Sequence, residues 1–167
     1  MEFKLNFNDF SFKEILSYIP NGNWMELKWG LEHECVSSED VIRYAKIVLE
    51  DGMDNFDTIL ELAISNSNED IYSLLSSLSR SEDECMNSIM NKWRFAILLW
   101  LYFHREEYEN VYEIIAILGA DFHHPADMNG FIYYMPISGY ASGSGLLSEW
   151  KQYLKEEIVN NNLKITL

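Results

Sequence analysis

The stretch that decides the fold is residues 93–103, which read WRFAILLWLYF. Apart from Arg94 its side chains are apolar or aromatic, and a helix without a polar face is surrounded by other elements. The uninterrupted apolar run, Phe95 to Phe103, spans less than half of a bilayer core that is roughly 30 Å thick. We therefore expect a buried central helix here and no membrane span.

Outside this stretch, apolar residues recur every three to four positions along most of the chain, which is typical of amphipathic helices. Polar residues that cap helices separate these segments, among them Asn23, and Ser37 with Asp40 at capping-box spacing. The pattern predicts an all-α fold of about eight helices, with helical hairpins stacked around a central helix near 81–104. The predicted helices cover residues 11–19, 24–34, 38–51, 54–65, 68–78, 81–104, 108–118 and 146–159.

Residues 120–145 interrupt this pattern. Five of the eight glycines lie between Gly119 and Gly145, together with two of the three prolines. We expect an irregular loop region here, with one helical turn near 127–132, inside a single domain that covers residues 1–167. Gly139 to Gly145 lacks the Lys-Ser/Thr of a phosphate-binding loop, so it is interpreted as a hinge or an adaptable contact loop.

The chain is strongly acidic, with 27 Asp and Glu against 12 Lys and Arg among 167 residues, a net charge of −15. This charge repels phosphate backbones and anionic lipid, so we expect neither nucleic acid nor membrane as a partner. A basic protein partner, or simple solubility, fits better. Residues 1–83 hold 17 acids and six bases, net −11, whereas residues 84–167 hold ten and six, net −4. The acidic surface therefore belongs mainly to the N-terminal half.

The location is expected to be the cytoplasm. The N-terminal residues lack the apolar core of a signal peptide, and Cys35 and Cys85 show no metal-ligand spacing, which suits a reducing compartment.

No catalytic motif is present, and we expect neither an enzyme nor a cofactor. His33-Glu34-Cys35 lacks the second histidine of a zinc-protease helix. The densest group of metal-type ligands has two readings: a weak metal site that needs one more ligand, or aspartates that cap turns around Pro125 with surface histidines. The metal candidates are Asp121, His123, His124 and Asp127.

Partner-binding candidates come from the acidic N-terminal half. Trp29 lies off the main apolar stripe of its helix and among acids, a composition that would suit an exposed interface anchor, although packing against the third helix is the favoured alternative. The candidate partner-binding residues are Glu26, Trp29, Glu32, Glu34, Glu39, Asp40, Asp51, Asp54 and Asp57.

The order of motifs in the C-terminal half resembles the bacterial domain-of-unknown-function family 2247. The residues that carry the resemblance are Lys92-Trp93-Arg94, Ile117, Asp121-Phe122, Pro125, Tyr134-Met135-Pro136 and Trp150. The resemblance implies a small cytoplasmic protein, and some relatives are encoded beside polymorphic or contact-dependent toxins, as immunity proteins are. The family supplies no catalytic residues.

Three functions follow from these observations. The first is an immunity or antitoxin-like protein that neutralises a basic toxin domain, for example a nuclease, through its acidic surface. The second is a metal- or small-ligand-binding protein that uses the 121–145 loop, with Tyr134 beside Asp121 and the two histidines. The third is an acidic interaction scaffold.

Overall fold

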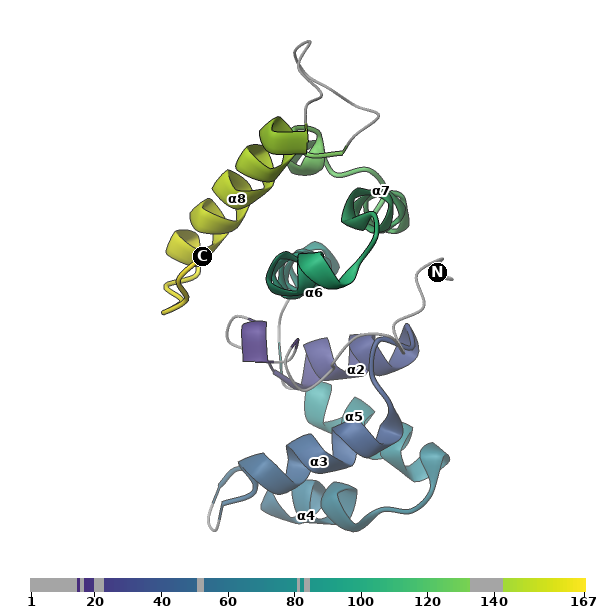
Figure 1. The fold of residues 1–167 in the computed structure, drawn as a ribbon. Helices are drawn as coiled ribbons and strands as arrows, with labels where there is room; N and C mark the ends of the chain where they lie inside the picture. The colour runs from purple at the N-terminus through teal and green to yellow at the C-terminus, as the bar shows by residue number, and fades with distance from the viewer. Residues whose placement is uncertain are drawn as a thin grey trace. The chain divides into compact units, whose positions relative to one another are not determined.

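The computed structural model describes residues 15, 17–19, 23–50, 53–80, 82, 85–132 and 143–167. The regular structure of these residues is entirely helical, so the predicted all-α fold is confirmed (Figure 1). Within the described ranges there are seven α-helices and two short 3-10 helices. They are α2 (Trp24–Glu32), α3 (Ser38–Val48), α4 (Phe56–Ile64), α5 (Asn68–Ser79), α6 (Met86–His104), η2 (Arg105–Glu107), α7 (Val111–Asp121), η3 (Ala126–Met128) and α8 (Gly143–Asn160).

Contacts between residues divide the chain into two compact units, and the division falls within α6, between Ile89 and Met90. We call the part that holds α2 to α5 the N-terminal unit. The part from Met90 onward, with residues 17–19, is the C-terminal unit. The expectation of one domain for residues 1–167 stays a prediction.

The N-terminal unit is a set of short helices in which each packs on its neighbours. α3 lies against α4, α4 against α5, and α2 against both α5 and α3 (Figure 1). The predicted helical hairpins are thus present. The core consists of aliphatic side chains from all four helices, including Leu27, Val41, Ile59, Leu62 and Leu75.

Two predicted N-terminal caps of this unit are confirmed. The Asn23 side chain accepts from the backbone of Met25 and Glu26, and Ser37 and Asp40 form a reciprocal capping box at the start of α3. Such caps satisfy backbone N–H groups that have no partner inside the helix. They fix where α2 and α3 begin.

The start of α2 receives a second cap from far along the chain. The Glu82 carboxylate accepts from the backbone nitrogens of Trp24, at 3.0 Å, and Met25, at 2.7 Å. A carboxylate at a helix N-terminus also complements the helix dipole. Because Glu82 lies 57 positions beyond Met25, spacing along the sequence gave no sign of this contact.

The C-terminal unit is built on α6. Every residue from Trp93 to Tyr102 is buried, which confirms the buried helix, although Phe103 is 40% exposed. Aromatic rings join α6 to α8: the Tyr102 ring meets the Trp150 ring edge-on with centroids 5.3 Å apart. η3 also contacts α8.

Several predicted helix boundaries are wrong. α6 begins at Met86 and not at Ser81, and α8 begins at Gly143 inside the expected loop region. α7 runs to Asp121, so Gly119 does not end it. Gly119 packs closely on Ile132, because a Cβ there would lie 2.7 Å from Ile132 Cδ1 and would require that side chain to shift. The predicted helix 11–19 lies mostly outside the described residues.

Candidate functional site

Four acidic residues flank the connection between α2 and α3, and we call Glu32, Glu34, Glu39 and Asp40 the acidic corner. The connection is tight, because the backbone nitrogens of Cys35 and Val36 both donate to the Gly30 carbonyl. Glu32, Glu34 and Glu39 are exposed and Asp40 is half-buried. The corner therefore places three solvated carboxylates on backbone that two capped helices hold in position.

Two of these carboxylates are neutralised locally. Lys28 Nζ lies 3.7 Å from Glu32 Oε1, and Arg43 Nη1 lies 3.2 Å from Asp40 Oδ1. Glu34 and Glu39 form no ion pair with any residue that the structure describes. The unpaired charge of the corner thus comes from Glu34 and Glu39.

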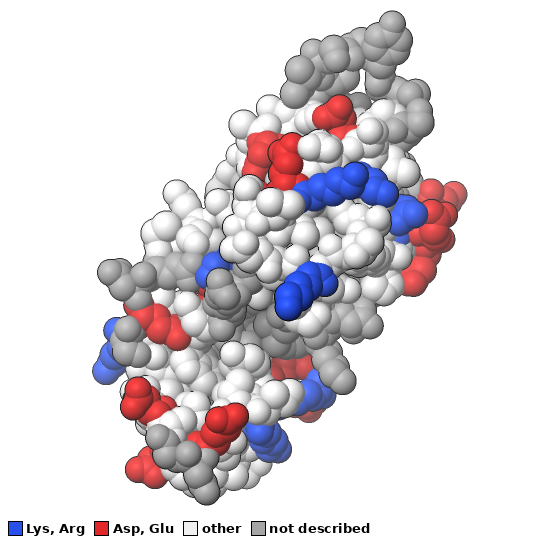
Figure 2. All heavy atoms as spheres, turned by 90° about the vertical axis from the view of Figure 1, so that its left-hand side faces the viewer, with Lys and Arg blue, Asp and Glu red and all other residues white. Residues whose placement is uncertain are grey.

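Asp54 and Asp57 are exposed but lie elsewhere. They precede or begin α4, next to the C-terminal end of α3, whereas the corner is at the N-terminal end of that 11-residue helix, about 16 Å away. Figure 2 shows carboxylates in several separate groups on the face it presents. The structure does not bring the predicted partner-binding residues into one cluster, and Asp51 lies outside the described residues.

Glu26 and Trp29 are corrections to the predicted surface. Glu26 is 1% exposed and Trp29 is 3% exposed. Glu26 serves the helix cap, because its Oε2 accepts from the Asn23 backbone nitrogen at 2.8 Å. Trp29 stacks on His33 with ring centroids 4.1 Å apart. Neither side chain is available as an exposed anchor in this structure.

The Trp29–His33 pair has a counterpart in the other unit. Trp100 and His104 stack with centroids 4.0 Å apart, and in both pairs the histidine Nδ1 contacts the carbonyl oxygen of the tryptophan, at 2.8 and 2.9 Å. Both pairs have i, i+4 spacing at the C-terminal end of a helix, the position where a side chain satisfies a free carbonyl. The W-x-x-x-H spacing occurs twice in the sequence, but stacking of these rings at the ends of helices was not predicted from it.

The histidines of the predicted metal loop have a backbone role. His123 and His124 adopt left-handed backbone, with φ of 62° and 53°. The backbone nitrogen of His123 donates to the Ala120 carbonyl at 3.1 Å, and that of His124 donates to the Gly119 carbonyl at 2.7 Å. These two hydrogen bonds end α7 in the manner of a Schellman motif. Both side chains are exposed.

The other two metal candidates, Asp121 and Asp127, also have structural roles. Asp121 is buried at the end of α7, and Asp127 pairs with Arg94. Across the described ranges, no group of three or more His, Cys, Asp or Glu side chains is arranged to hold a metal ion. The structure therefore does not assemble the predicted metal set, and Tyr134 lies outside the described residues.

Arg94 is the centre of a buried polar group in the C-terminal unit. It is 5% exposed, and its Nη2 donates to Asp127 Oδ2 at 2.5 Å. Burial raises the pKa of the neighbouring Tyr153 to about 12, against the opposing effect of the Arg94 charge and hydrogen bond. Arg94 Nε and the buried Trp150 Nε1 have no hydrogen-bond partner in the described part of the chain. The group joins α6, η3 and α8.

Comparison with known proteins gives one family. A family model described as an uncharacterized protein conserved in bacteria, DUF2247, matches residues 13–158. The chain belongs to the DUF2247 family. Comparison with curated proteins and with solved structures gives no match.

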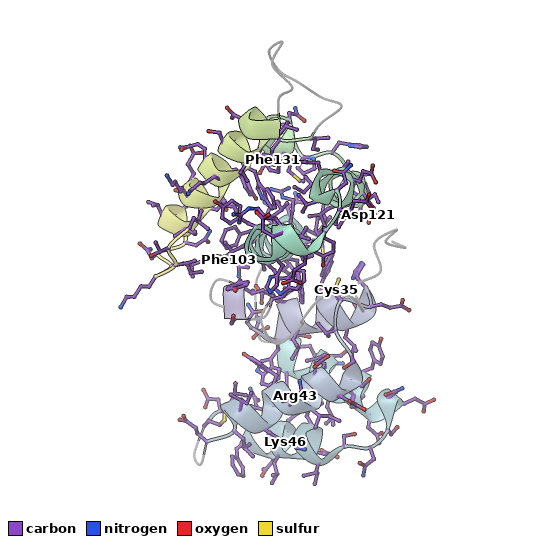
Figure 3. The ribbon with its side chains drawn as sticks, in the orientation of Figure 1. Cys35, Arg43, Lys46, Phe103, Asp121 and Phe131 are labelled. Atoms are coloured by element: carbon purple, nitrogen blue, oxygen red, sulfur yellow. The ribbon has the colours of Figure 1, made fainter. Side chains whose placement is uncertain are left out.

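The residues that carried the DUF2247 resemblance are mostly interior in this structure. Trp93, Arg94, Asp121 and Phe122 are all buried, and Pro125 directly precedes η3. Figure 3 labels Asp121 at the end of α7. Tyr134, Met135 and Pro136 lie outside the described residues. The part of the family signature that the structure describes therefore builds the C-terminal unit.

None of the helices in the described ranges is long and apolar enough to cross a membrane.

Proposed function

We propose that this DUF2247 protein is an immunity or antitoxin-like binding protein that neutralises a basic toxin domain, for example a nuclease. The acidic corner is the proposed contact site. The observation that supports this most is a pair of exposed carboxylates, Glu34 in the tight α2–α3 connection and Glu39 in the first turn of α3, that form no ion pair with the residues the structure describes.

The physical argument concerns the free energy and rate of association. An unpaired carboxylate forms a new ion pair with a basic partner without first breaking an old one. Like-signed surface charge also steers an oppositely charged partner, and raises association rates toward 10⁸–10⁹ M⁻¹s⁻¹ at low salt, as an order of magnitude. The net charge of −11 on residues 1–83 acts in the same direction.

The acidic corner is also held rigidly before any partner binds. The capping boxes at Asn23 and Ser37 fix the starts of α2 and α3, and the Gly30 carbonyl ties down the chain between them. A rigid site loses less conformational entropy on binding. The corner therefore suits a partner that recognises a fixed spacing of carboxylates.

The first experiment is co-expression of this protein with a toxin encoded beside its gene. We expect the cells to survive with the wild-type protein and to die without it. Death at the same rate in both cases overturns the proposal.

The second experiment tests the corner. Association with the purified toxin domain is measured by stopped flow at several salt concentrations, for the wild type and for the double variant Glu34→Gln, Glu39→Gln. The matched control is Glu107→Gln, Glu109→Gln, which removes two exposed charges from the C-terminal unit. We expect the corner variant to associate at least several-fold more slowly with a shallower salt dependence, and the control to change little. Equal effects of the two variants remove the corner from the proposal.

A further inference from the structure

A shallow groove of about 470 Å³ lies on the N-terminal unit between α3 and the end of α4. Its α3 wall consists of Glu39, Ile42, Arg43 and Lys46, and Ile64 of α4 lines the other side. The four α3 positions follow i, i+3, i+4, i+7 spacing, which places them on one stripe of the helix. Figure 3 labels Arg43 and Lys46 at the α3–α4 pair.

One large apolar side chain of the groove is well exposed: Ile64 is 68% exposed to solvent. Ile47, which follows Lys46 on α3, is 70% exposed but is not one of the residues that line the groove. The groove therefore combines one exposed apolar side chain with a charged α3 wall.

The charges of the stripe are of opposite sign at its two ends. Glu39 and Lys46 are separated by seven residues, about 10 Å along the helix axis. Neither of them has an ion-pair partner among the residues described, whereas Arg43 between them is held by Asp40 at 3.2 Å. The stripe therefore offers one free anion and one free cation.

We propose that this groove binds the same groove of a second copy of the chain, with the two α3 helices antiparallel across a two-fold axis. In a two-fold interface, if residue i contacts residue j, then j contacts i. A two-fold axis through the midpoint of the stripe places Glu39 of each copy opposite Lys46 of the other copy. It also places the Arg43 stem over Ile42 of the second copy.

The charge pattern favours a second copy over other occupants. An acidic partner would place its charge against Glu39, and a basic partner would place its charge against Lys46. A partner that complements both Glu39 and Lys46 must carry a positive and a negative charge at the same spacing and in the reverse order. The same stripe of a second copy, placed antiparallel, has this arrangement. The inference does not rest on a toxin partner, but Glu39 belongs to both proposed surfaces, so a second copy and a toxin would compete for this residue.

Sedimentation velocity of the purified chain tests this directly, at concentrations from about 1 to 300 µM, the range in which weak interfaces are populated. We expect a reversible monomer–dimer equilibrium. Glu39→Lys or Lys46→Glu alone places like charges at both contacts and weakens the dimer about tenfold or more. The combined variant Glu39→Lys, Lys46→Glu exchanges the charges and returns the dissociation constant to within about threefold of the wild type.

Two further experiments distinguish loss of the proposed interface from loss of folding. Mixing the two single variants, each of which dimerises weakly alone, gives a heterodimer in which both charge contacts are complementary. Ile64→Asp abolishes the dimer, whereas Val159→Asp, at a comparably exposed β-branched position of α8 (73% exposed), leaves it intact. A wild-type chain that is monomeric throughout, or a charge exchange that restores nothing, overturns the proposal. A dimer lost equally in Val159→Asp also overturns it.

Discussion

Arg94 Nη2 donates to Asp127 Oδ2, which joins the middle of α6 to η3 across 33 positions of sequence. The arginine side chain is 6% exposed and the aspartate side chain 47% exposed, so the cation is buried and its partner is half in solvent. A buried charge that loses its partner carries an uncompensated desolvation cost. The pair therefore links stability of the C-terminal unit to Asp127, for which the sequence left open a turn cap or a weak metal site.

Asp127→Ala should lower the free energy of unfolding by about 2 kcal/mol, less than for a fully buried pair because water already screens the aspartate. Urea denaturation followed by circular dichroism measures this. Adding Arg94→Met should recover part of the loss, since the apolar side chain needs no counter-charge. A double variant less stable than the sum of the two single changes would contradict this account.

Tyr153 predicts an alkaline limit to stability. Its folded pKa is raised to about 12 by burial, whereas an unfolded tyrosine ionises near pH 10. Between these values the unfolded state has fewer protons bound, so the contribution of Tyr153 to stability, complete below about pH 10, is lost as pH rises toward 12. Denaturation at pH 8, 10 and 11 should show a smaller decline for Tyr153→Phe than for the wild type. Equal declines would mean that another group is responsible.

The two cysteines should differ in reactivity. Both are free thiols, but Cys35 is buried and Cys85 exposed, and burial raises the pKa of the Cys35 thiol. Because the thiolate is the reactive form, a thiol reagent at pH 8 should modify one cysteine per folded chain and two after denaturation. Cys85→Ser should leave the folded chain without fast modification. Fast labelling of that variant would show that the α2–α3 connection opens readily.

The sequence predicted the helical class because apolar periodicity is a local signal, and it located the caps at Asn23 and Ser37 because capping depends on neighbours three residues apart. It failed where a contact is distant. The Glu82 cap of α2 and the Arg94–Asp127 pair join residues 33 to 58 positions apart, which no local pattern encodes.

The errors at the candidate site have a related cause. Trp29 and Glu26 looked exposed because α2 buries a broad face that also includes Leu27, Gly30 and Leu31, wider than the single stripe that periodicity suggests. The exposure of an acid also says nothing about whether a cation neutralises it. Only the structure separates the unpaired Glu34 and Glu39 from Asp40, which Arg43 holds.

The end of α7 supplies a prediction about backbone strain. His123 has a φ of 62°, a left-handed conformation that costs a non-glycine residue about 1–2 kcal/mol. His123→Gly removes that cost but adds freedom to the unfolded chain, so a net stabilisation of about 0.5–1 kcal/mol is expected in urea denaturation. His123→Ala keeps the strain and should give no gain, although it removes the same imidazole. Asn162→Gly, at a φ of 53°, is the matched control and should gain less, because asparagine tolerates this conformation better than histidine. If the alanine variant were as stable as the glycine variant, the imidazole and not the backbone would be the source of the effect.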